Sequence, residues 1–167
     1  MHMRQRLVLS LVSSLWLHVA REVFGETLFV DDVDLSITLS RMQLQARRNL
    51  FKRVRHIHLD ISAGYDIRYR DLSVLASSFC GKLSHLSVCF EENTVRTYEI
   101  LEIFLEACPF LAFVDLTGAD FGDDPDVIGT RFQRHAPRLK QMQLIQCRGD
   151  IETLLNPIIP RGVLVFQ

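Results

Sequence analysis

The stretch Cys108-Pro109-Phe110-Leu111-Ala112-Phe113-Val114-Asp115-Leu116 decides the fold, because a helical pattern ends at its proline and an apolar/polar alternation of period two begins directly afterwards. The same pattern returns upstream as Cys80-Gly81-Lys82-Leu83-Ser84-His85-Leu86-Ser87-Val88 and downstream as Ala136-Pro137-Arg138-Leu139-Lys140-Gln141-Met142-Gln143-Leu144. A fourth copy, with a weaker start, is Phe51-Lys52-Arg53-Val54-Arg55-His56-Ile57-His58-Leu59. The leading apolar residues, Val54, Leu83, Leu111 and Leu139, follow one another at steps of 29, 28 and 28 residues. A repeat of this length is typical of solenoid proteins.

A helical pattern precedes each of the last three copies. Its apolar or small positions recur every four residues, which places them on one helical face. These triplets are Leu72, Ala76 and Cys80; Ile100, Phe104 and Cys108; and Ile128, Phe132 and Ala136. The third member is small, so we expect helix and strand to approach closely there. Gly81, Pro109 and Pro137 are expected to end the helices.

The alternating segments predict parallel strands, one in each repeat and each linked to the next by a crossover helix. Their inward residues are apolar in every copy: Ile57 and Leu59, Leu86 and Val88, Val114 and Leu116, Met142 and Leu144. After the last copy, the pattern predicts a two-turn helix containing Ile151, Leu154 and Leu155, and a final strand over 163–166.

Length and composition indicate one folded domain. The chain has 167 residues, of which 48% are apolar, so it can bury one core. Its formal net charge of −1 conceals an uneven spread, basic over 1–58 and acidic over 59–167, but this asymmetry is too mild to indicate the concentrated basic face that nucleic acid requires. Cys80 and Cys108 share one repeat position, which favours small buried thiols over disulfides and hence a reducing compartment, the cytoplasm or the nucleus.

The first twenty residues leave two alternatives open. Apolar residues recur every four positions from Leu7 to Val19, which predicts an amphipathic helix over 5–24. Arg4 and Arg6 precede the same apolar run, which is also the order found in a secretory signal peptide. The run is too short to span a membrane. Further on, we expect a short strand at Leu28-Phe29-Val30 and a second helix over 35–50.

This N-terminal segment resembles the second half of an F-box. The resemblance is carried by the run Ser10-Leu11-Val12-Ser13, by Trp16 three residues later and by the predicted strand at 28–30. The Leu-Pro turn and the helix with which an F-box begins have no counterpart here. The resemblance implies that Leu11, Val12 and Trp16 belong to the surface that binds the ligase adaptor.

The repeats resemble the cysteine-containing leucine-rich repeats of F-box proteins. A Leu-x-x-Leu-x-Leu strand follows a Cys-Pro-x lead-in, and the resemblance extends over residues 37–147. Cys147 stands where that class of repeat places its cysteine. The resemblance implies an α/β fold: a short right-handed leucine-rich-repeat solenoid over 37–167, with about four repeats and a shortened last one, preceded by a helical cap over 1–36.

The outward positions of the strands are the candidate binding residues. Side chains alternate along a strand, so these positions form rows across neighbouring strands on the face away from the helices, the concave face of a solenoid. We interpret this face as a polar, partly aromatic docking surface for a protein or peptide, with Phe113 as its apolar anchor. The predicted partner-binding residues are His56, His58, Asp60, His85, Ser87, Phe113, Asp115, Gln141 and Gln143.

Catalytic and metal chemistry have little support. No phosphate-binding glycine loop and no Gly-x-Ser-x-Gly motif is present. The acidic segment 123–126 fits a helix start, with Asp124 as cap and Pro125 in the first turn, better than a calcium loop. Sheet rows rarely converge tetrahedrally, which disfavours a zinc site drawn from His56, His58, Asp60, His85 and Cys89. We therefore expect a protein that is not an enzyme and has no metal or cofactor.

Together the two resemblances imply the substrate receptor of an SCF-type ubiquitin ligase, which would hold a protein substrate on its concave face and the ligase adaptor at its N-terminal helix. Two alternatives stay open. One is a leucine-rich-repeat scaffold that binds a partner without a ligase, and the other is a secreted leucine-rich-repeat protein with a signal peptide over 1–20. Neither nucleic acid nor a membrane is an expected partner.

Overall fold

The computed structural model describes residues 26–31, 39, 53–62, 69–91, 97–122 and 124–167. Apart from the buried Leu39, the helices predicted over 5–24 and 35–50 lie outside these residues, as does the proposed boundary between 36 and 37. The described part of the chain alternates strands with helices, so its fold is α/β.

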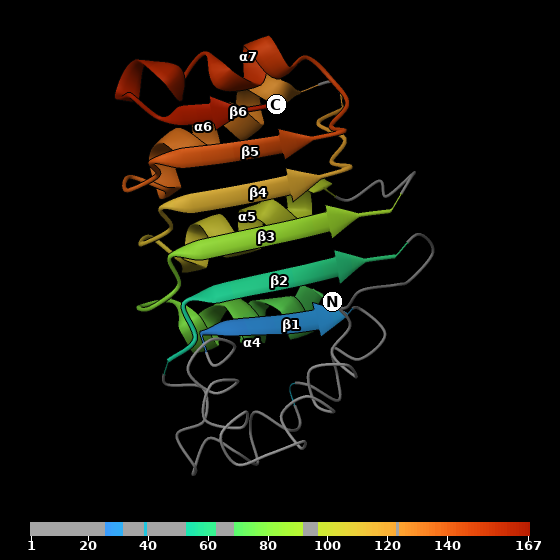
Figure 1. Ribbon diagram of the computed structural model, residues 1–167, viewed down its shortest axis with the longest axis vertical. Coiled ribbons are helices and arrows are strands. Elements are labelled where there is room, and N and C mark those ends of the chain that lie inside the picture. The colour runs from blue at the N-terminus through green and yellow to red at the C-terminus, as the bar shows by residue number, and fades with distance from the viewer. Residues whose placement is uncertain (1–25, 32–38, 40–52, 63–68, 92–96, 123) are drawn as a thin grey trace, which may run out of the picture.

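One sheet of six parallel strands organises the protein, and the spatial order of the strands follows the sequence (Figure 1). The strands are β1 (Thr27–Asp31), β2 (His56–Ile61), β3 (His85–Phe90), β4 (Phe113–Thr117), β5 (Gln141–Ile145) and β6 (Leu164–Phe166). His56 lies opposite His85, His85 opposite Phe113, and Phe113 opposite Gln141. These partners are one repeat step apart, so the predicted side-by-side arrangement of the four copies is confirmed.

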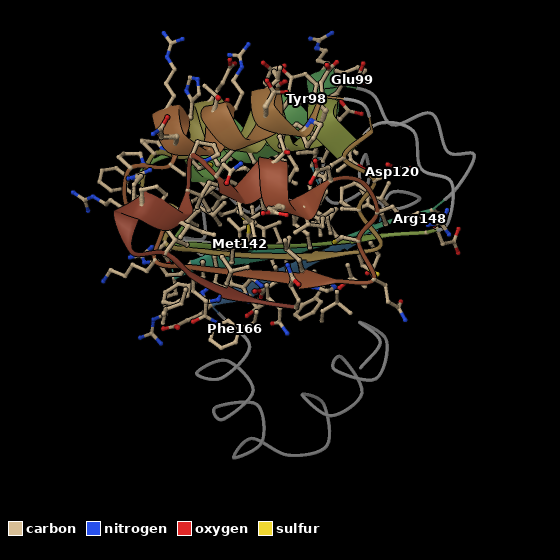
Figure 2. All side chains as sticks on the ribbon, turned by 90° about the horizontal axis from the view of Figure 1, so that it is seen from above. Tyr98, Glu99, Asp120, Met142, Arg148 and Phe166 are labelled. Atoms are coloured by element: carbon tan, nitrogen blue, oxygen red, sulfur yellow. The ribbon has the colours of Figure 1, made fainter. Side chains whose placement is uncertain are left out.

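The helices connect neighbouring strands. Among the described residues they are α4 (Tyr69–Phe79), α5 (Thr97–Ala107), α6 (Pro125–His135) and α7 (Ile151–Leu155), followed by the short 3-10 helix η2 (Ile159–Arg161). Helices α4, α5 and α6 lie on the same side of the sheet, which Figures 1 and 2 show from two directions. The opposite side of the sheet has no helix among the described residues.

The core lies between the sheet and its helices. All inward strand residues predicted from the alternation are buried: Ile57, Leu59, Leu86, Val88, Val114, Leu116, Met142 and Leu144. Phe104 of α5 and Phe132 of α6 are fully buried at equivalent positions of their repeats. Burial of an aromatic side chain of this size contributes about 1.5–3 kcal/mol relative to exposure, so this shared interior stabilises the stack.

The prediction that Cys80 is a buried thiol is wrong. Cys108 and Ala136 are buried at the corresponding positions, and each donates its backbone N–H to the carbonyl four residues earlier. At Cys80 the chain turns more tightly, because its N–H points to the Ser77 carbonyl, only three residues earlier, at 3.5 Å. This turn leaves Cys80 exposed and buries Phe79 against the sheet.

Two helix starts illustrate capping. Pro125 is the first residue of α6, as predicted, but Asp124 at the N-cap position makes no side-chain capping hydrogen bond. Asp150, at the N-cap of α7, accepts hydrogen bonds from the Thr153 backbone N–H at 3.0 Å and the Thr153 hydroxyl at 2.6 Å. These bonds satisfy one of the free amides at the start of α7, and they lower the pKa of Asp150.

The last part of the chain follows the predicted order of helix and strand. Helix α7 buries Leu154 and Leu155, and β6 extends the sheet beside β5. Throughout the described residues, every helix is too short or too polar to cross a lipid bilayer.

Candidate binding face

The side of the sheet opposite helices α4, α5 and α6 carries the candidate site. We define the open face as the outward side chains of β2 to β5: His56, His58, Asp60, His85, Ser87, Cys89, Phe113, Asp115, Thr117, Gln141, Gln143 and Ile145. Strand pairing places them in three rows that cross the four strands. All nine predicted partner-binding residues belong to this set.

The first row is aromatic. His56, His85, Phe113 and Gln141 occupy successive strands in register. The rings of His85 and Phe113 are stacked, with centroids 4.4 Å apart and an interplanar angle of 8°, and the His56 ring lies 4.9 Å from that of His85 at 44°. All three rings are partly exposed. The row therefore presents a strip of ring edges across three strands.

Burial shifts the protonation of His85 in this row. Desolvation lowers the pKa of His85, and the nearby Asp115 carboxylate opposes the shift without cancelling it. The neutral imidazole is therefore the favoured form of His85 at neutral pH. A neutral ring stacks on Phe113 without the cost of burying a charge.

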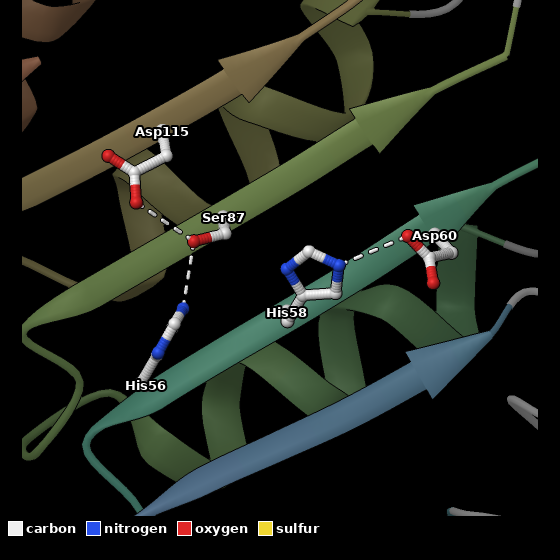
Figure 3. Close-up of polar contacts among 5 residues, drawn as sticks. All are labelled: His56, His58, Asp60, Ser87 and Asp115. Atoms are coloured by element: carbon white, nitrogen blue, oxygen red, sulfur yellow. Dashed lines mark hydrogen bonds and ion pairs between the residues drawn. The ribbon is translucent and has the colours of Figure 1, made fainter. Parts of the chain in front are cut away.

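A hydrogen-bonded network joins His56 of the first row to Ser87 and Asp115 of the second. The Ser87 hydroxyl donates to Asp115 Oδ2 at 3.1 Å and lies 2.8 Å from His56 Nε2 (Figure 3). A hydroxyl has one proton, so Nε2 of His56 must be the donor to Ser87. In the neutral ring Nδ1 is then the acceptor, and the Thr27 hydroxyl is 3.4 Å from it. The network links β1, β2, β3 and β4.

The order of groups in this network differs from that of a catalytic triad. In a nucleophilic triad the imidazole accepts the serine proton. Here that proton points to Asp115, and Ser87 is only 7% exposed. The arrangement fits a role in holding neighbouring strands and fixing the Asp115 carboxylate.

The third row begins at Asp60, whose side chain is 62% exposed. Its Oδ1 lies 3.1 Å from Nε2 of His58 in the second row (Figure 3). Asp60 lies beside Cys89 in the register. Desolvation, together with Asp60 and Glu91, raises the pKa of Cys89, which keeps its thiol protonated at neutral pH.

The zinc hypothesis finds no cluster to support it. Within the part of the chain that the structure describes, no three His, Cys, Asp or Glu side chains converge as metal ligands would. His56 instead bonds to Ser87, and His58 bonds to Asp60.

Strand β1 adds to the face, which the sequence reasoning missed. Phe29 lies opposite His58, and their rings are 5.2 Å apart at 41°. The sequence contained a signal for this, because Leu28 and Ile57 are 29 residues apart, which is one repeat length. The two residues are partners in the register of β1 and β2. At the other end, β6 places Phe166 beside Gln143, and Phe166 is 49% exposed.

The proposed adaptor-binding residues Leu11, Val12 and Trp16 lie outside the described residues. A comparison of the chain with protein-family models and with curated proteins found no match. The geometry of the open face is therefore the basis for a functional interpretation.

Proposed function

We propose that this protein is a short leucine-rich-repeat solenoid that recognises a protein partner through the open face and has no catalytic role. The observation that carries the proposal is the in-register row of His56, His85 and Phe113 on the side of the sheet opposite helices α4, α5 and α6. The repeat period of 28 or 29 residues and the crossover helices support the leucine-rich-repeat assignment.

The composition of the open face favours a protein partner over a solvated surface. None of its twelve positions is Lys or Arg, although the whole chain has 19 of these residues. Its acidic residues are Asp60 and Asp115, and its other positions combine Phe113 and Ile145 with histidines and glutamines. Protein interfaces show this bias, because their buried centres are depleted of charge and enriched in aromatic side chains.

A double variant tests the proposal. His85→Ala with Phe113→Ala removes the stacked pair but leaves the buried side of the sheet intact. Proteins captured from a cell extract by the immobilised wild-type chain should be lost with this variant. Val127→Ala on α6, which trims a residue 41% exposed on the helix side, is the matched control. Equal capture by the double variant, with a native circular dichroism spectrum, would contradict the assignment.

We further propose that the module is the substrate receptor of an SCF-type ubiquitin ligase, because F-box-like residues precede the repeats in the sequence. Co-purification with the ligase adaptor, abolished by Trp16→Ala, would support the receptor. Partner capture without the adaptor would instead favour a scaffold that has no ligase. Cleavage after Ala20 with oxidised cysteines would favour the secreted alternative.

A further inference from the structure

The open face has an uncompensated negative charge. Its acidic residues are Asp60 and Asp115, and it has no lysine or arginine. Ion pairs among the described residues include those of His58 with Asp60 and of Arg131 with Glu102 and Glu106. Within the described part of the chain, no cationic side chain lies within ion-pair distance of Asp115. The face therefore presents a carboxylate that no group of the described chain neutralises.

Asp115 differs from Asp60 in its surroundings. It is partly buried, and its carboxylate accepts one hydrogen bond, from the Ser87 hydroxyl at 3.1 Å. Asp60 is more exposed and already lies against His58. A partly buried carboxylate with one hydrogen bond has acceptor positions left, and water solvates them incompletely. A cation of the partner should therefore gain more binding free energy at Asp115 than at Asp60.

An apolar strip lies directly beside this carboxylate. Phe113 is two residues before Asp115 on the same face of β4, a separation of about 7 Å, and its ring stacks on that of His85. On the neighbouring strand, Gln143 is opposite Asp115. The site thus combines ring edges, a carboxylate and an amide oxygen within the length of one long side chain.

We infer that the partner of the open face presents an arginine, whose methylene stem lies over the His85–Phe113 stack and whose guanidinium binds Asp115 and the side-chain oxygen of Gln143. Arginine fits better than lysine because its planar fork offers several donors to one carboxylate and its neighbour. Its apolar stem matches the rings. This inference rests on the proposed function, since it names the chemistry of the partner bound at the same face.

The test uses a fluorescein-labelled peptide of alternating arginine and leucine, with a glutamate/leucine peptide as its charge-reversed control. Fluorescence anisotropy should show binding of the arginine peptide to the full chain. Asp115→Asn should weaken that binding about tenfold, the loss expected for a charge-assisted hydrogen bond. The variant is isosteric, so Ser87 can still donate to the new side-chain oxygen. Asp60→Asn should have a smaller effect, and Asp126→Asn on α6 should have none.

Two results would overturn the inference: equal affinity for the glutamate peptide, or arginine-peptide binding that Asp115→Asn leaves unchanged. The proposed function fails in a different way. If His85→Ala with Phe113→Ala keeps natural partner capture, the open face is not the recognition surface. If capture is lost with that double variant but survives in Asp115→Asn, recognition through the face stands and the arginine assignment is wrong.

Discussion

Substitution of Gly129 by alanine should destabilise the packing of α6 against α7. A Cβ atom on Gly129 would lie 2.3 Å from the Leu154 backbone oxygen and 2.8 Å from Pro157 Cγ. The Leu154 oxygen belongs to the backbone of α7, so it cannot rotate away as a flexible side chain would. Alanine therefore requires a movement of one helix relative to the other.

The size of the effect follows from that displacement. To reach an ordinary contact of 3.4 Å, the distance from the Cβ to the Leu154 oxygen must increase by roughly 1 Å from 2.3 Å. Overpacking of this kind costs about 1–3 kcal/mol, and the clash with backbone places it in the upper part of that range. Alanine recovers about 1 kcal/mol through its higher helix propensity. We expect a net loss of about 1–2 kcal/mol in the free energy of unfolding, or about 2–8 °C in Tm.

Urea and thermal unfolding followed by circular dichroism would measure this loss. Gly81→Ala is the matched control, because a Cβ there meets nothing within 4 Å and the residue has no positive φ. That control should stay within about 0.5 kcal/mol of wild type. If Gly129→Ala is as stable as wild type, or if Gly81→Ala loses as much, the close approach of α6 and α7 is not what requires glycine at position 129.

Three further predictions concern the core, one histidine and the thiols. Phe104→Ala should reduce the free energy of unfolding by about 3–5 kcal/mol through loss of burial and creation of a cavity. Phe110→Ala, at a 38% exposed position, should cost about 1 kcal/mol or less. Urea titration compares the two variants, and equal losses would contradict the core assignment. The lowered pKa of His85 means that the unfolded chain binds more protons, so stability should fall as the pH drops below 6.5 towards the folded pKa. His85→Gln should flatten that part of a Tm-against-pH curve, and an unchanged slope would assign it to another group. Burial raises the pKa of Cys108 to about 12. Iodoacetamide should therefore label the exposed Cys80 in the native protein long before Cys108. Peptide mass spectrometry would measure the order, and comparable labelling of the two thiols would refute it.

The periodicity predicted much of the strand arrangement, because one repeat step along the sequence leads from one strand to its neighbour in the sheet. Val54, Leu83, Leu111 and Leu139 are all buried, and the strands that follow them pair in register. The alternation also identified which side chains belong to the open face. It could not identify their contacts, since a row position says nothing of ring orientation or of which hydroxyl donates.

The failure at Cys80 has a similar cause. Its position in the repeat matches those of Cys108 and Ala136, so a pattern treats the three as equivalent. The end of α4 instead tightens by one residue and turns the thiol outward. Local turn geometry depends on how the last helical turn meets the following strand, which the repeat period does not specify.

The sequence by itself determined the unit, its length and the two faces of every strand, because helical and strand periodicities are local properties that repeat along the chain. Only the tertiary structure decided that Ser87 gives its proton to Asp115, that His85 stacks on Phe113, and that α6 needs glycine against α7. Each of these depends on side chains or backbones of different repeats meeting at distances of a few ångströms. Such contacts exist only after the repeats have stacked.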